Sequence, residues 1–159
     1  MALSAAKYNS TVQALARGGA SGTGLLLNAD TLKMGLCTNA TVPAAADTTF
    51  PGTGTQVANG NGYATGGVSL TGATAQNPAG TEVLKTTTNF ASPTWTASGA
   101  GFTVQYFIWY DSTAAASPCY LLARWDYGSA LTLSGANADT LDISGSNFNS
   151  ATPGWGTLV

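Results

Sequence analysis

The run FTVQYFIWY at residues 102–110 constrains the fold of this chain more than any other part of the sequence. As a β-strand it would divide its apolar side chains between two faces, because successive side chains of a strand point in opposite directions. One face would have Phe102, Val104, Tyr106, Ile108 and Tyr110, and the other would have Phe107 and Trp109. The second half of the run is therefore apolar on both sides. We expect it to be a central strand that other parts of the chain cover on both faces.

A second apolar run follows this strand at a distance suited to a hairpin. Residues 111–113 (DST) begin a polar turn that ends at Pro118, and residues 119–125 (CYLLARW) form another predicted strand. Two strand segments joined by a short polar connection favour antiparallel pairing. The sequence therefore predicts a central β-hairpin over residues 102–125.

Shorter strands are predicted on both sides of this hairpin. They cover residues 31–37, 62–70, 82–88, 94–97, 131–133, 141–143 and 155–159. In the first of them Leu32, Met34 and Leu36 share one face, and the Gly66-Gly67 pair in the second marks a bulge or a close approach of two backbones. About eight short strands separated by Gly, Pro and Asn predict an all-β fold. A jelly roll is our first choice of topology, and a related open β-sandwich is the second.

A long connection lies between the first two of these strands. Residues 38–61 include Pro43, Pro51 and several glycines, and they lack a strand pattern. A connection of this length is unusual inside a compact domain, and such loops are often functional or mobile.

The first 24 residues differ from the rest of the chain. Residues 3–17 combine alanines with a narrow apolar stripe, and Gly18-Gly19 would end a helix there. The stripe has Leu3, Tyr8, Val12 and Leu15, of which the last three recur at helical spacing. The segment is predicted to be either a short amphipathic helix or an arm that becomes ordered on a partner. Residues 18–24 (GGASGTG) are predicted to be a flexible joint.

These features divide the chain into two parts. Residues 1–24 are predicted to be the helix or arm with its glycine-rich joint, and residues 25–159 a β-sandwich domain. Leu3, Tyr8, Val12 and Leu15 are the candidate residues of a protein interface. The alternative is that the helix simply packs on its own sandwich.

Low charge narrows the classes of partner. Charged residues make up 8% of the chain, and the net charge is −2, whereas about 25% is typical. The five Lys and Arg residues are scattered, so the sequence lacks the basic cluster that nucleic-acid binding needs. No apolar run reaches the roughly 18 residues that span a bilayer, and the N-terminus lacks the pattern of a secretion signal. We therefore expect a protein that is made and used without passing a secretion system, and that has no direct nucleic-acid or membrane partners.

Residue types that carry most enzyme chemistry are scarce. The chain has no histidine, which removes the commonest general base and metal ligand. Its carboxylates fall mostly at predicted turns and strand ends, where Asp caps or turns the backbone. They are Asp30, Asp47, Glu82, Asp111, Asp126, Asp139 and Asp142. Cys37 and Cys119 are expected to be free thiols, with a disulfide as the alternative. We therefore expect no enzymatic activity, no metal site and no cofactor.

Aromatic residues offer one alternative function. Four tryptophans and six tyrosines could form a sugar-binding platform. Trp109 and Trp125 lie in the predicted hairpin, however, and are expected to be core or interface anchors.

Several motifs carry a resemblance through their order and spacing. They are the MALSA opening, DTLKMGL at 30–36, NGYATGGVSL at 61–70, PTWTASGAGFTVQYFIWYDST at 93–113, LLARWDYG at 121–128 and GWGTL at 154–158. Over most of the chain they resemble a family of small virion-associated structural proteins of tailed bacteriophages. The resemblance implies a virion component with a jelly-roll or related β-sandwich fold and without enzymatic activity. The first loop is less acidic than the family pattern and residues 146–152 add a polar stretch, so no binding residue is carried over from the family.

Composition and resemblance together favour a capsid decoration, or cement, protein on the capsid surface of the virion. A surface poor in charge suits a chain that packs against other subunits, although an ordinary β-sandwich can have the same composition. The expected partners are the major capsid protein and further copies of the chain, with a trimer as the preferred homo-oligomer. The alternatives are a tail, baseplate or fibre component and a carbohydrate-binding adsorption module. A jelly roll supports all of these functions.

Overall fold

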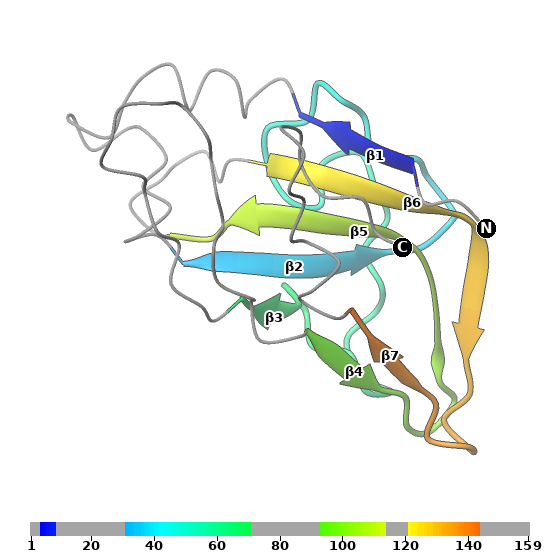
Figure 1. Ribbon diagram of the computed structural model, residues 1–159. Coiled ribbons are helices and arrows are strands. Elements are labelled where there is room, and N and C mark those ends of the chain that lie inside the picture. The colour runs from blue at the N-terminus through cyan, green and yellow to red at the C-terminus, as the bar shows by residue number, and fades with distance from the viewer. Residues whose placement is uncertain (1–3, 9–30, 71–92, 114–120, 144–159) are drawn as a thin grey trace.

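The computed structural model describes residues 4–8, 31–70, 93–113 and 121–143, and these residues form an all-β fold (Figure 1). The strands of the described part are β1 (Ser4–Lys7), β2 (Leu32–Cys37), β3 (Val68–Ser69), β4 (Thr94–Thr96), β5 (Phe102–Asp111), β6 (Leu121–Leu133) and β7 (Thr140–Asp142). No helix occurs within these ranges. The prediction of an all-β fold is confirmed.

The strands form two antiparallel sheets. The main sheet has the order β1-β6-β5-β2-β3, and β4 pairs with β7 in a second, two-stranded sheet. Strand β5 lies in the middle of the main sheet, paired with β6 on one side and with β2 on the other. The predicted central hairpin is therefore confirmed, whereas the jelly-roll topology stays a prediction. The predicted strands at 82–88 and 155–159 lie outside the described residues.

The prediction of a helix near the N-terminus is wrong for residues 4–7, which form β1 instead. Strand β1 pairs antiparallel with β6, and Ala5 lies opposite Trp125. Alanine-rich segments favour a helix locally, but tertiary pairing overrides such weak preferences. Here the edge of β6 supplies backbone partners that the sequence of the segment does not reveal. The remainder of the predicted helix, the joint and the domain boundary at residue 24 lie outside the described residues.

A change of register alters the faces predicted for β5. The pairing of β5 with β6 shifts between Val104 and Tyr106, so the alternation of the side chains is interrupted there. Val104 consequently packs in the same cluster as Phe107 and Trp109, and not with Tyr106 as predicted. An irregularity that inserts an extra residue moves all following side chains to the opposite face. Figure 1 shows β5 and β6 turning a corner together toward β4 and β7, and the predicted strand at 131–133 is the last part of β6.

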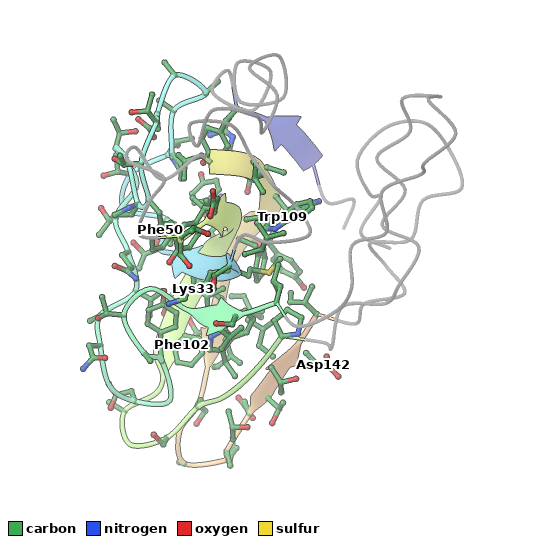
Figure 2. All side chains as sticks on the ribbon, turned by 90° about the vertical axis from the view of Figure 1, so that its left-hand side faces the viewer. Lys33, Phe50, Phe102, Trp109 and Asp142 are labelled. Atoms are coloured by element: carbon green, nitrogen blue, oxygen red, sulfur yellow. The ribbon has the colours of Figure 1, made fainter. Side chains whose placement is uncertain are left out.

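Two clusters of buried side chains cover the two faces of the main sheet. The larger cluster joins the main sheet to β4 and β7 and includes Leu32, Met34, Leu36, Trp95, Phe102, Val104, Phe107, Trp109, Leu122, Trp125, Leu133 and Ile143. The smaller cluster has Tyr8, Cys37, Tyr106, Ile108, Tyr110 and Leu121, with Phe50 packed against it. Figure 2 shows Phe50 and Trp109 on opposite sides of the sheet. The predicted coverage of β5 on both faces and the shared face of Leu32, Met34 and Leu36 are confirmed.

The Gly66-Gly67 pair marks a close backbone approach, as predicted. A Cβ atom at Gly67 would overlap the carbonyl oxygen of Met34, and the φ angle of Gly67 is 71°. The strand predicted at 62–70 is reduced to Val68–Ser69. Its first residues turn instead, because Gly60 and Tyr63 exchange two backbone hydrogen bonds of 2.8 and 2.9 Å.

Candidate interaction surface

Residues 38–55 form a closed loop on the side of the main sheet that carries the smaller cluster. The loop leaves the end of β2 and returns to it, since the Thr38 N–H donates to the Thr55 carbonyl at 2.8 Å and the Val57 N–H donates to the Leu36 carbonyl at 3.0 Å. Cys37 and Gln56 form an isolated β-bridge at the same place. The two ends of the loop are therefore fixed next to each other on the sheet.

The carboxylate of Asp47 braces the middle of the loop. Its Oδ2 atom accepts hydrogen bonds from the Ala44 N–H at 2.8 Å and from the N–H and hydroxyl of Thr53, both at 3.0 Å. The Thr53 hydroxyl also accepts a hydrogen bond from the Ala44 N–H at 3.0 Å. Hydrogen bonds to an ionised acceptor are stronger than those between neutral groups. Asp47 thus ties the two halves of the loop together.

Two further contacts fix the loop to the strands beneath it. The Phe50 ring stacks on the Tyr110 ring of β5, with centroids 4.5 Å apart and planes 7° from parallel. The Arg124 guanidinium of β6 donates a hydrogen bond to the carbonyl of Pro43, whose side chain is fully buried. The loop is therefore held at its two ends, across its middle and at two points on the sheet, so its conformation is set before any partner binds.

The exposed residues of this loop are uncharged, and the carboxylate of Asp47 is partly buried. Val42 is 56% exposed and is the exposed large hydrophobic residue of the described part of the chain. The other exposed loop residues are small or polar and neutral: Asn39, Ala40, Thr41, Ala45, Ala46, Thr48, Thr49, Gly52, Thr53 and Thr55. We call these residues, with Val42, the neutral loop surface. A partner that covers it would not have to remove water from an ionised side chain, which is the costly part of burying a polar surface.

The smaller cluster beneath the loop is neutral as well. Burial raises the pKa of the Cys37 thiol to about 12, and the negative charge of Asp47 acts in the same direction. Burial also raises the pKa of the Tyr8 phenol, against the smaller opposing effect of the Arg124 charge. Cys37 has a free, buried thiol as predicted, and Cys119 lies outside the described residues. Thiol and phenol are therefore uncharged at neutral pH.

Of the four residues predicted to form an interface, Tyr8 alone lies in the described part of the chain. Its side chain is 1% exposed and belongs to the smaller cluster of its own domain. Its hydroxyl has no hydrogen-bond partner among the described residues. Leu3, Val12 and Leu15 lie outside the described residues.

The structure also shows where the tryptophans considered for sugar binding and several of the carboxylates lie. Trp95, Trp109 and Trp125 are between 1% and 4% exposed, so these three do not form a sugar-binding platform on the surface. The carboxylates of Asp111, at the end of β5, and Asp139, just before β7, each accept a backbone N–H at 2.8 Å, which confirms the role predicted for them. Asp126 instead lies inside β6, where its carboxylate accepts the Gly128 N–H at 2.8 Å. No group of three or more potential metal-ligating side chains occurs in the described ranges.

Sequence reasoning identified residues 38–61 as a functional or mobile connection but missed how it is held. The spacing of Asp47 and Thr53 follows no recognised turn pattern, and Arg124 is far away in sequence.

Comparison with protein-family models, with curated proteins and with solved structures finds no match. Among the described residues there is also no helix with the length and hydropathy needed to cross a membrane.

Proposed function

We propose that this chain is a structural protein of a tailed-phage particle that decorates and stabilises the capsid by binding, without catalysis. The observation that carries the proposal is the neutral loop surface, which is fixed to a rigid sheet and exposes Val42. The motif order of the sequence, which resembles that of small virion proteins of tailed phages, supports the same function. We propose the loop as the contact surface, while the interface predicted for Leu3, Val12 and Leu15, which lie outside the described residues, stays a prediction.

The bracing of the loop suits this function in energetic terms. A loop that is already in its binding conformation does not lose conformational freedom when a partner covers it. Each contact with the shell then contributes a modest free energy, and the total grows because a capsid repeats the same site many times. Because the neutral loop surface carries no ionised side chain, the attraction to the shell should depend little on salt.

The first test is the copy number of the protein in purified virus particles, measured by quantitative mass spectrometry relative to the major capsid protein. A ratio close to that of the capsid protein is expected, since only the capsid lattice offers so many equivalent sites. A few copies per particle would instead support the tail or baseplate alternative. Absence from the particle would overturn the proposal.

The second test concerns the loop itself. Val42→Asp places a charge on the neutral loop surface and should weaken binding to undecorated capsids at least about tenfold, because the carboxylate must lose its water on binding. Asn137→Asp is the matched control, since Asn137 is exposed in the turn between β6 and β7. Equal binding of both variants would exclude the loop as the contact surface while leaving the copy-number result intact.

A further inference from the structure

Strand β1 and the residue after it form a small and separable part of the fold. Among the described strands, β1 lies at one end of the main sheet and pairs with β6, from Ser4 opposite Asp126 to Lys7 opposite Ala123. The next residue, Tyr8, places its side chain in the smaller cluster with Leu121 and is 1% exposed. In the described part of the chain, the contact between residues 4–8 and the rest of the domain therefore consists of one short strand pairing and one buried ring.

The surface that β1 covers is well suited to bind a strand. Without β1, strand β6 would present unpaired backbone N–H and C=O groups, and such an edge readily pairs with another chain. The smaller cluster would also lack the Tyr8 ring that fills it. Residues 4–8 both pair with the edge of β6 and fill the smaller cluster, and they can do so whether they come from the same chain or from another copy.

The length of the connection does not restrict this segment to its own domain. Residues 9–31 separate Tyr8 from β2, and a chain of that length can span at most about 80 Å. A domain of this size is about 40 Å across. The connection is therefore long enough for β1 to reach β6 of a neighbouring copy.

We propose that residues 4–8 exchange between copies, so that β1 and Tyr8 of one copy complete the main sheet and the smaller cluster of another. Exchange of an identical element keeps every contact and is a common, inexpensive route to an oligomer. The equilibrium between the closed monomer and the exchanged oligomer then depends on protein concentration. The segment of the same chain acts as if it were present at an effective concentration of about 1 mM or less, and segments of other copies compete with it. The closed monomer is favoured in dilute solution, and the exchanged oligomer is favoured where copies are crowded. The proposal stands independently of the function proposed above.

A pair of cysteines tests the exchange in the full-length chain. Lys7→Cys and Ala123→Cys place two thiols at directly paired positions in a chain that also carries Cys119→Ser. A mixture of unlabelled and ¹⁵N-labelled protein is oxidised at concentrations from micromolar to millimolar. Peptide mass spectrometry then measures the fraction of disulfides that join a peptide from an unlabelled copy to a peptide from a ¹⁵N-labelled copy. We expect the mixed disulfide to rise from a few per cent of the total toward the statistical half as the concentration increases.

The matched control uses a pair within the β5–β6 hairpin, which cannot exchange in the same way. Thr103 and Thr132 are directly paired, and their hydroxyls lie 3.1 Å apart. Thr103→Cys with Thr132→Cys should give disulfides within one chain at every concentration. The proposal is overturned if the Lys7/Ala123 pair behaves like this control up to millimolar protein.

Discussion

The ring of Phe50 stacks on the ring of Tyr110 and at the same time covers Gly35 of β2. A Cβ atom at Gly35 would overlap the Phe50 ring, so the absence of a side chain at this position makes room for the stack. Phe50 belongs to the loop and Tyr110 to the central strand, and a glycine on the neighbouring strand thus permits the contact that holds the loop down.

Gly35→Ala should therefore loosen the loop. The Phe50 ring would have to move away from Tyr110, and we expect a loss of about 1–2 kcal/mol in the free energy of unfolding, measured by urea denaturation. In a Phe50→Ala background the same substitution should cost clearly less, because the obstructing ring is gone. An equal cost in both backgrounds would show that the stack is not what the added methyl group disturbs.

Gly67→Ala should be more damaging than Gly60→Ala. Both glycines have positive φ angles, 71° and 107°, so both substitutions strain the backbone. A Cβ at Gly67 would also overlap the Met34 carbonyl, whereas nothing lies within 4 Å of a Cβ at Gly60. Backbone atoms cannot move aside as a side chain does, and we expect Gly67→Ala to cost at least about 2 kcal/mol more. Thermal unfolding of the two variants measures the difference, and similar melting temperatures would contradict it.

The hydroxyl of Tyr8 should contribute nothing to stability. It is buried without a hydrogen-bond partner among the described residues, and an unsatisfied buried polar group costs about 1–3 kcal/mol. We expect Tyr8→Phe to be as stable as the natural chain or more stable by up to about 1 kcal/mol. Tyr8→Ala should lose about 3 kcal/mol, since it removes a buried ring. A Phe variant destabilised by more than about 1 kcal/mol would mean that the hydroxyl is bonded in solution.

Cys37 should make the protein less stable at alkaline pH. Its pKa is about 12 in the folded chain, above the ordinary value of 9.0, so between these two values the unfolded thiol ionises while the folded one stays protonated. Ionisation therefore favours the unfolded state as the pH rises through this window, by at most about 1.4 kcal/mol per pH unit. Tyrosines titrate in the same range, so the comparison is with Cys37→Ala, both chains carrying Cys119→Ser. Urea denaturation between pH 8 and 10.5 should show a shallower decline for the Ala variant, and parallel profiles would refute the assignment.

The sequence was sufficient for the parts of the fold that depend on apolar pattern. The central place of β5, its pairing with β6 and the shared face of Leu32, Met34 and Leu36 all follow from alternating or continuous hydrophobic runs. The close approach at Gly67 follows from a paired glycine in a strand pattern. In each case the signal is local, because the residues concerned are neighbours in sequence.

The features that the sequence did not reveal depend on contacts between distant residues. Ala5 lies in an alanine-rich segment with helical preference, and pairing with Trp125 makes it part of a strand. The register shift beside Gln105 leaves no mark in the apolar pattern, although it reverses the faces of Phe102 and Val104. The candidate surface was equally hidden, because its bracing requires Arg124 of β6 to meet Pro43 of the loop.

Asp47→Ala should loosen the conformation of the loop without changing the residues that the loop exposes. The substitution removes the acceptor for Ala44 and Thr53 but leaves the neutral loop surface unchanged. Hydrogen exchange of the Ala44 and Thr53 amides should accelerate about tenfold or more as the brace opens, with a loss of about 1–2 kcal/mol in the free energy of unfolding. Because a loosened loop must be ordered again on binding, its affinity for undecorated capsids should also fall. Asp142→Ala, which removes the same charge from an exposed position of β7, should change neither property. Full binding by the Asp47 variant despite fast exchange would show that the loop need not be braced to reach its partner.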